Sequence, residues 1–445
     1  MAFDLVIRTS SAFVDGAFRA ADIGITDGRI AAIETHLDGE VVELAADEVL
    51  IPGIVDTHVH VNEPGRTEWE GFASATRAAA AAGVTTLIDM PLNSVPTTIS
   101  LEALLLKRQV ALDKVMVDTG FWGGAVPENL GALRELHEGG VFGFKAFLAP
   151  SGIDEFGHLD ADQLERALGE IAALGSQLIV HAEDPAVLDA HANHGGTRYE
   201  AFVESRPDEA ETTAIERVIA GVRRTGARAH ILHLSSAAAL PALRAARTEG
   251  LPITVETCPH YLVLAAEGIE DGATQFKCCP PIRSEANREA LWQALLDGDI
   301  DVIVTDHSPA TADLKFAGDG DFQVAWGGIA GLQTGFSSVW TEAASRGIPL
   351  DRVLQWMSTG TADLVGLAQK GRIAVGADAD LVAFAPDARY TVHAAELEHR
   401  NPISAFEGRD LRGVARRTWL RGHPVSIAAD ALVTGRLLSR NAYDM

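Results

Sequence analysis

The chain is poor in cysteine and has no long apolar run. Its three cysteines, Cys258, Cys278 and Cys279, form no ladder of spacings in 445 residues, which excludes a disulfide scaffold and favours a reducing compartment, the cytoplasm. No segment approaches the roughly 20 apolar residues that span a bilayer. The start from Met1 to Phe13 lacks a basic stretch followed by a long apolar core, so no secretory signal is expected.

Basic residues are also scarce. Lysine and arginine total 36 against 62 aspartates and glutamates, and the formal net charge is -26. Such a surface repels phosphate backbones and anionic lipids, which argues against nucleic acid or a membrane as a partner. A hydrophobic fraction of 47% with 22% charged residues is typical of globular proteins. We therefore expect a globular protein with an acidic, solvated surface.

Both ends of the chain have a β texture. Apolar alternation and the hairpin signal Asp27-Gly28 mark the N-terminal part, and the texture returns after residue 370. Because these parts flank the rest of the chain, the simplest packing joins them. We therefore predict one small β-sandwich built from both termini, with residues 1–50 as its N-terminal part and residues 371–445 as its C-terminal part and tail.

The segment from 51 to 370 alternates strand and helix patterns. Helical patterns such as Asp160–Leu174 and Glu209–Thr225 separate most of the strands. The eight predicted strands are 49–60, Val84–Met90, Val115–Phe121, Gly143–Leu148, Gln177–Ala182, Ala229–Leu234, Ile253–Thr257 and Asp301–Thr305. Eight strands that alternate with helices predict an α/β fold, a TIM-like (β/α)8 barrel.

Ligand-type residues fall at the ends of these strands. His58 and His60 end the first strand. Side chains two positions apart on a strand project to the same side, so these two can hold one metal ion. Reactive groups of a parallel barrel lie at the C-terminal strand ends. His181, His233 and Asp306 end the fifth, sixth and eighth strands. Each histidine alone also fits a buried core residue, but together they predict a metal site.

Lys145 lies inside the fourth predicted strand, which is apolar. A lysine there must be paired, neutralised or modified. A salt bridge would explain it. Alternatively, a neutral amine can react with CO2 to a carbamate (N6-carboxylysine), whose two oxygens bridge two cations.

With Lys145 as the bridge, six residues compose a site for two divalent ions. One ion takes His58, His60 and Asp306, and the other takes His181 and His233. These ligands suit zinc first, and also cobalt, manganese, nickel or iron. Two such ions lower the pKa of a bridging water and polarise a carbonyl oxygen. Asp306 would take the proton of the hydroxide and pass it to a leaving nitrogen, so the predicted reaction is hydrolysis at a carbonyl.

Eight motifs give the chain a resemblance to the cyclic amidohydrolases of the amidohydrolase superfamily, and among them to the allantoinases. They run in that family's order, and with the flanking β segments they cover nearly the whole chain; the motifs are Pro52–His60, Asp89–Ser94, Gly143–Phe147, His233–Ser236, Glu256–Leu262, Cys279–Arg283, Thr305–Pro309 and Ala325–Gln333. The resemblance implies the same six metal ligands. It also implies hydrolytic ring opening of a cyclic ureide, (S)-allantoin to allantoate, in purine catabolism.

Two positions bear on the substrate that the resemblance implies. Dihydroorotases usually carry an arginine, for the substrate carboxylate, where this chain has Asn62. Hydantoinases and dihydropyrimidinases usually place a tyrosine in the loop after the modified lysine, and the loop 149–156 has none. In both features the chain resembles allantoinases.

The resemblance also implies a set of substrate contacts and an assembly. The contacts are Asn62, Asn93, Cys279, Ser308 and Gly328. Cys279 departs from the serine that is usual there, which matters little if the contact is through the backbone. Relatives are often homotetramers, so the same assembly is expected.

Two alternatives to an allantoinase remain. One is a hydantoinase, dihydropyrimidinase or dihydroorotase activity. The other is a non-catalytic scaffold, although such relatives usually lose ligands and all six positions are occupied here.

Overall fold

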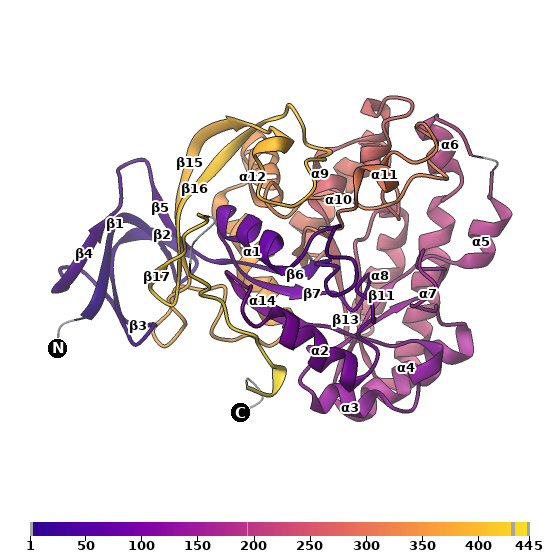
Figure 1. Ribbon diagram of the computed structural model, residues 1–445, viewed down its shortest axis with the longest axis horizontal. Coiled ribbons are helices and arrows are strands. Elements are labelled where there is room, and N and C mark those ends of the chain that lie inside the picture. The colour runs from indigo at the N-terminus through magenta and orange to yellow at the C-terminus, as the bar shows by residue number, and fades with distance from the viewer. Residues whose placement is uncertain (1–2, 194, 429–431, 443–445) are drawn as a thin grey trace.

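The computed structural model describes residues 3–193, 195–428 and 432–442. The chain forms a barrel of parallel strands with a sheet at one end that contains both terminal segments (Figure 1). Within the described ranges, no helix is long and apolar enough to cross a membrane.

One eight-stranded sheet unites the two ends of the chain. Its order is β17-β16-β15-β5-β1-β2-β3, with β4 paired to β1. The strands are β1 (Phe3–Val14), β2 (Ala17–Thr26), β3 (Arg29–Glu34), β4 (Gly39–Glu43), β5 (Val49–Pro52), β15 (Leu381–Thr391), β16 (Asp410–Leu420) and β17 (His423–Pro424). Antiparallel pairing of β5 with β15 joins the ends, which confirms that the two termini pack together. Residues 1–2, 429–431 and 443–445 of the predicted terminal parts lie outside the described residues.

The expected sandwich is a continuous sheet that changes partner along β1. The first part of β1 pairs with β4, and its second part pairs with β5 at Ala12, after an irregularity between Thr9 and Ala12. This sheet carries a separate apolar cluster, which includes Ile23 of β2, Leu50 of β5 and Trp419 of β16.

The barrel strands lie in two parallel sheets. The first is β6-β7-β8 and the second is β14-β13-β12-β11-β10-β9. The strands are β6 (Ile54–Val59), β7 (Val84–Asp89), β8 (Asp118–Phe121), β9 (Gly123–Gly124), β10 (Phe144–Phe147), β11 (Gln177–His181), β12 (Arg228–Ile231), β13 (Ile253–Thr257) and β14 (Val302–Ile303). Only Trp122 separates β8 from β9, and a parallel bridge between Val59 and His307 links the other two edges. The arrangement is that of an α/β barrel.

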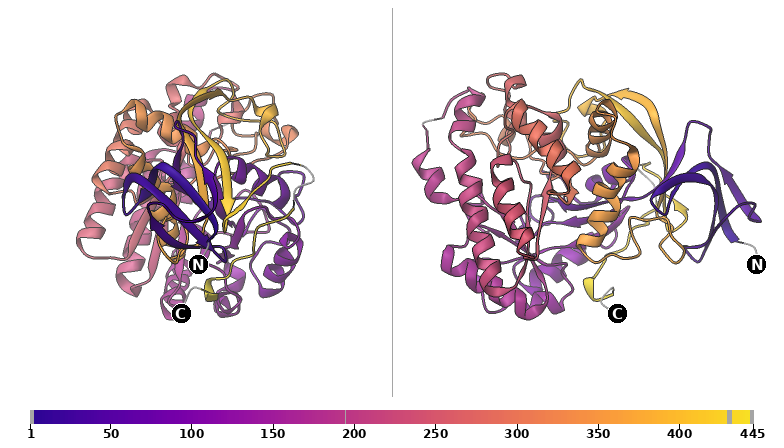
Figure 2. Two further views of the ribbon diagram at one scale, coloured as in Figure 1. Left: turned by 90° about the vertical axis from the view of Figure 1, so that its left-hand side faces the viewer. Right: turned by 180° about the vertical axis from the view of Figure 1, so that it is seen from behind.

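Helices surround the barrel strands (Figure 2). They are α1 (Phe72–Ala81), α2 (Leu101–Ala111), α3 (Leu133–Glu138), α4 (Ala161–Leu174), α5 (Pro185–Ala190), α6 (Tyr199–Glu204), α7 (Asp208–Thr225), α8 (Leu240–Thr248), α9 (Pro259–Val263), α10 (Glu285–Asp297), α11 (Ala312–Lys315), α12 (Gly335–Ser345), α13 (Leu350–Leu354) and α14 (Gly360–Leu364). Helix α4 shows why they begin and end where they do. Asp160 caps its start by accepting from the Gln163 amide, and Gly175 ends it in the left-handed conformation.

The prediction of one strand over 49–60 is wrong. The chain leaves the terminal sheet after β5 and enters the barrel with β6, so the hydrogen-bond partners change at Gly53. The Gly53 amide donates to the Asp380 carbonyl at 2.9 Å, whereas the Ile54 amide donates to the Gly83 carbonyl at 3.0 Å. Glycine is required because a Cβ at position 53 would lie 2.0 Å from Thr85 Oγ1.

Two further strands end at least two residues earlier than predicted, whereas β7, β10 and β11 end one residue earlier. β12 stops at Ile231 rather than Leu234, and β14 stops at Ile303 rather than Thr305. The reason is the backbone beyond them: φ is 35° at His233 and 45° at Asp306, and a left-handed residue cannot continue a β ladder. Both residues therefore lie in the turns just past the strand ends.

Candidate active site

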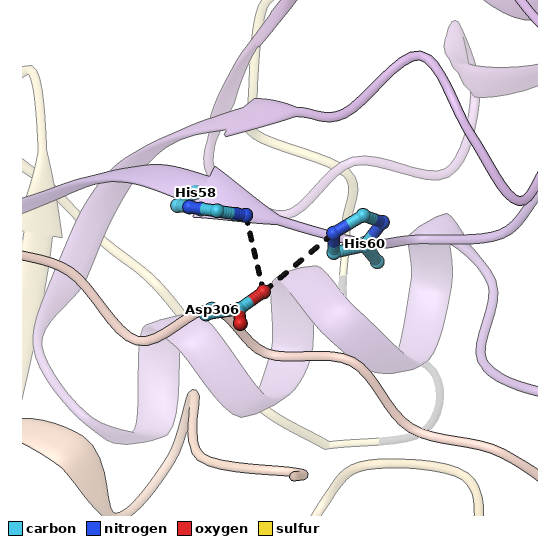
Figure 3. A group of neighbouring side chains, drawn as sticks. All are labelled: His58, His60 and Asp306. Atoms are coloured by element: carbon cyan, nitrogen blue, oxygen red, sulfur yellow. Dashed lines mark ion pairs between the residues drawn. The ribbon is translucent and has the colours of Figure 1, made fainter. Parts of the chain in front are cut away.

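His58 and His60 direct one ring nitrogen each at Asp306 (Figure 3). His58 Nδ1 lies 2.5 Å from Glu256 Oε1 and His60 Nδ1 lies 2.9 Å from the Leu92 carbonyl. Because carboxylate and carbonyl oxygens accept, both Nδ1 atoms carry a proton, and the Nε2 atoms, which face Asp306, are the candidate ligand atoms. The Nε2 atoms lie 3.1 and 3.6 Å from Asp306 Oδ1.

A second pair of histidines faces inward beside the first. His181 Nδ1 lies 3.0 Å from His233 Nε2, and His181 Nε2 lies 2.7 Å from Glu183 Oε2. The rings of His58 and His233 are 5.5 Å apart between centroids, so the four imidazoles form one cluster. The buried His233 Nδ1 has no hydrogen-bond partner within the described part of the chain.

Lys145 lies on β10 within the same cluster and is 1% exposed. Its Nζ is 3.5 Å from His58 Nε2 and 4.9 Å from the centre of the Phe147 ring. Across residues 3–193, 195–428 and 432–442, no carboxylate lies within 4.0 Å of this ammonium. The salt bridge considered for Lys145 is therefore absent from the described residues, and the amine is buried without a counter-charge in contact.

The buried charges shift the pKa values of the cluster. Burial lowers the pKa of Lys145 to about 8, although Asp306 and Glu256 oppose this. Burial also lowers the pKa of His58, but the carboxylates of Asp306 and Glu256 outweigh it and raise the value to about 9. Burial holds the pKa of His60 and of His233 well below the usual range. Burial raises the pKa of Asp306, but the neighbouring His58 outweighs it, so Asp306 is a carboxylate.

This set of donors fits divalent metal ions. The ligand atoms of His58, His60 and Asp306 all lie within 4.8 Å of one another. Four clustered imidazoles, a carboxylate and a buried ring nitrogen without a partner among the described residues are costly together in a protein interior unless a cation completes them. Imidazole and carboxylate are the ligands of zinc and related metals.

Two outer carboxylates hold the histidines, and the sequence did not reveal either. Glu256, on β13, contacts the His58 ring, accepts from the His233 amide at 3.1 Å and lies 3.0 Å from His230 Nε2. Glu183 contacts His181 and forms a two-point ion pair with Arg206. An acidic residue inside an apolar strand, as at Glu256, is the signal that could have found the first.

A cavity of about 370 Å³ opens above this cluster. Its lining includes four of the five predicted substrate contacts, Asn93, Cys279, Ser308 and Gly328, together with Lys145, His60, His181, His233 and Asp306. Asn62 is not part of the lining. It lies behind Asn93, where its Oδ1 accepts from Asn93 Nδ2 at 3.2 Å and its Nδ2 donates to the Pro309 carbonyl at 3.3 Å.

An α/β barrel that gathers four histidines, an aspartate and a buried lysine at its strand ends defines a metal-dependent hydrolase. The chain belongs to the amidohydrolase family, whose sequence model matches residues 49–425. A relative from Streptomyces avermitilis named allantoinase is 55% identical, over 98% of this chain and 99% of its own length. An allantoinase of Arabidopsis thaliana is 44% identical, over 85% of this chain and 78% of its own.

Solved structures agree on the fold. An L-hydantoinase (dihydropyrimidinase) from Arthrobacter aurescens matches with a TM-score of 0.92 at 30% identity, covering 98% of this chain and all (100%) of that chain. A D-hydantoinase (dihydropyrimidinase) from Thermus sp. matches with a TM-score of 0.89 at 28% identity, over 99% of this chain and 100% of that chain. These neighbours support a barrel with a small sheet domain.

Proposed function

We propose that this chain hydrolyses the ring amide of (S)-allantoin to give allantoate. The reaction class rests on the six-residue cluster at the floor of the cavity. The choice of substrate rests on one observation above all, the 55% identity to an allantoinase over 98% of the chain.

In this proposal the six residues hold two divalent ions. His58, His60 and Asp306 would hold one ion and His181 and His233 the other. Lys145 would be a ligand as N6-carboxylysine, after its amine has added to CO2 and lost a proton. Zinc is the first choice, with cobalt, manganese, nickel or iron as alternatives. When bound, such ions supply Lewis acidity to a carbonyl oxygen and acidify water.

Asp306 accepts and then donates the proton in this proposal. Because its pKa lies well below the usual range, Asp306 is ionised at neutral pH and can accept a proton from the attacking water. The same carboxyl group then returns the proton to the ring nitrogen as the amide bond breaks. Its position beyond β14, beside His58 and His60 and in the cavity lining, supports this role.

The cavity wall suits a neutral substrate. Arg206 lines the cavity but is engaged with Glu183, and Lys277 donates to the carbonyls of Gln323 and Ala325. Neither cation is free for a substrate carboxylate, which disfavours dihydroorotate. We propose that Asn93, Ser308 and the backbone of Cys279 and Gly328 contact the ureide, and that Asn62 acts by holding Asn93.

A hydantoinase is the second candidate, because the TM-score of 0.92 to an L-hydantoinase shows that the two share a fold. Ring-opening assays with allantoin, hydantoin, dihydrouracil and dihydroorotate on protein reconstituted with zinc and bicarbonate separate the candidates. We expect the highest kcat/KM with allantoin. A higher kcat/KM with any other substrate would exclude the proposal. A non-catalytic scaffold would instead bind less than one ion per chain after reconstitution.

We further propose three features that the relatives or the sequence suggest. These are a homotetramer, a cytoplasmic location, and a hydrolase barrel at residues 51–370 between the terminal parts 1–50 and 371–445.

A further inference from the structure

Five of the six lysines in the chain are buried, and their partners differ. Lys107 pairs with Asp89, Lys370 pairs with three aspartates, and Lys145 belongs to the ligand cluster. The sixth lysine, Lys114, is partly exposed and pairs with Glu63. The remaining two, Lys277 and Lys315, donate to backbone carbonyls. Within the described ranges neither has a carboxylate within 4.0 Å of its amino group. One region therefore buries two lysine side chains without an acidic partner.

Lys315, the last residue of α11, donates to three carbonyl groups. Its Nζ lies 2.9 Å from the Lys277 oxygen, 3.1 Å from the Trp326 oxygen and 2.5 Å from the Gly328 oxygen. Three acceptors match the three N–H groups of a charged ammonium. Hydrogen bonds from a charged donor are stronger than those between neutral groups, so this contact ties the two backbone segments together.

The segment that Lys315 holds is a wall of the substrate cavity. All six residues from 323 to 328 line the cavity, and they form neither helix nor strand. Lys277 Nζ donates to the carbonyls of Gln323 and Ala325, at 3.3 and 2.5 Å, and the Gly328 amide donates to the Lys277 carbonyl at 2.9 Å. Two ammonium groups thus fix four carbonyls of a segment that has no regular structure of its own.

The wall is also closely packed against a predicted substrate contact. A Cβ at Gly328, where φ is 123°, would lie 2.3 Å from the Ser308 carbonyl oxygen. Movement of the segment 323–328 would therefore displace Ser308 or open a gap beside it. The position of this segment decides the shape of the site around the bound ring.

We propose that Lys315 is a positioning residue for the hydrolysis: its ammonium fixes the cavity wall 323–328 and thereby sets KM, while the chemistry at the ligand cluster proceeds without it. This inference rests on the proposed function.

The proposal carries a pH dependence of a definite sign. A neutral amine has two N–H groups and cannot serve three carbonyls. Burial lowers the pKa of Lys315 to about 7; the thiols of Cys278 and Cys279 oppose the shift and the charge of Lys277 adds to it. The third bond is therefore present below pH 7 and lost as the pH rises through that value, so KM increases with pH.

Lys315→Met keeps the length of the side chain and removes every donor. With full-length protein reconstituted with zinc and bicarbonate, we expect KM for allantoin to rise at least about tenfold, the effect of losing strong hydrogen bonds to one group. We expect kcat and the metal content to stay close to those of the parent, and the rise of KM above pH 7 to disappear. Arg166→Met, at an exposed residue of α4 outside the cavity lining, is the control and leaves KM unchanged.

A Lys315→Met protein with the parent KM and the parent pH profile would overturn the proposal. If the variant does not fold, amide hydrogen exchange of the parent decides. Peptides that cover 322–328 should lose protection between pH 6.5 and 8.5, after correction for intrinsic exchange, while peptides of α12 do not. Equal corrected protection at both pH values overturns the inference. If the parent protein is inactive on allantoin, the proposed function is refuted instead. The exchange experiment then still tests whether Lys315 fixes the segment 323–328.

Discussion

Among single residues, Lys145 has the surroundings that the proposed carbamate requires. It is buried without a carboxylate in contact among the described residues, and its lowered pKa, about 8, leaves an appreciable fraction of neutral amine at physiological pH. At pH 7 about a tenth of such amines are neutral, far more than for an ordinary lysine. The neutral amine is the form that adds to CO2.

Lys145→Ala should lose both metal and activity. Loss of an outer partner of a ligand costs roughly 10–100-fold in affinity or activity, and loss of the bridging group should cost more. Metal content by mass spectrometry and ring opening of allantoin check this, with apo-protein of the parent restored by bicarbonate plus metal as the positive control. Full activity in the variant would refute the bridge.

Glu256→Gln should weaken metal binding without removing a ligand. The carboxylate fixes the His58 ring and accepts from the His233 amide, and a glutamine cannot accept all of these contacts. We expect a fall in metal affinity of about 10–100-fold, measured by competition with a chelator. The exposed Glu204 provides the control Glu204→Gln. Unchanged affinity in Glu256→Gln would show that the outer carboxylate has no such role.

The residues at the strand ends were predictable, whereas their partners were not. The position of His58, His181 and Asp306 follows from alternation along the chain, which is a local pattern. The contact between His58 and Glu256 joins residues 198 apart, and that between Lys315 and Gly328 depends on a segment without regular structure. Contacts of this kind depend on how distant elements pack, which no spacing in the sequence specifies.

At the scale of elements, the junction between β5 and β6 connects the terminal sheet to the barrel. The apolar run 49–60 suggested one strand because apolar side chains continue through Gly53, but the two halves pair with different sheets. Strand existence was predicted for every barrel strand except the short β9. The early ends of β12 and β14, before His233 and Asp306, were not predicted. A left-handed backbone conformation at these two residues has no clear signal in the sequence.

Gly53→Ala should therefore destabilise the protein. Its Cβ would meet Thr85 Oγ1 at 2.0 Å, and overpacking of this kind costs about 1–3 kcal/mol. Gly169→Ala is a matched control, because a Cβ there meets nothing within 4 Å inside α4 and should stabilise by about 0.5–1 kcal/mol. Urea unfolding measures both changes. A Gly53→Ala protein as stable as the parent would show that the junction has room to adapt.

At the scale of the whole molecule, a buried ion-pair network connects the barrel to the terminal sheet. Lys370 pairs with Asp118 on β8 at 2.5 Å and with Asp380, next to β15, at 2.7 Å. Arg421, which follows β16, pairs with the same Asp118 at 2.6 Å. The two parts of the chain are therefore joined by charge as well as by apolar packing.

Lys370→Met should lower the thermal unfolding midpoint while leaving the active site intact. Removing one partner of a buried network leaves uncompensated carboxylates and costs about 3–5 kcal/mol. Below the midpoint, metal content and KM should match the parent, because Lys370 lies outside the ligand cluster and the cavity lining. Differential scanning calorimetry checks the midpoint, with Arg166→Met, at an exposed residue of α4, as control. A parent-like midpoint would mean that the network adds nothing to stability.

We propose that six residues, one of them a modified Lys145, hold two divalent ions in this site. A crystal structure of protein reconstituted with zinc and bicarbonate, with anomalous data at the zinc edge, tests it most directly. We expect two anomalous peaks among His58, His60, His181, His233 and Asp306, with density for a carboxylate that extends from Lys145 Nζ to both. A single peak, or an unmodified Lys145 beside two ions, would contradict it.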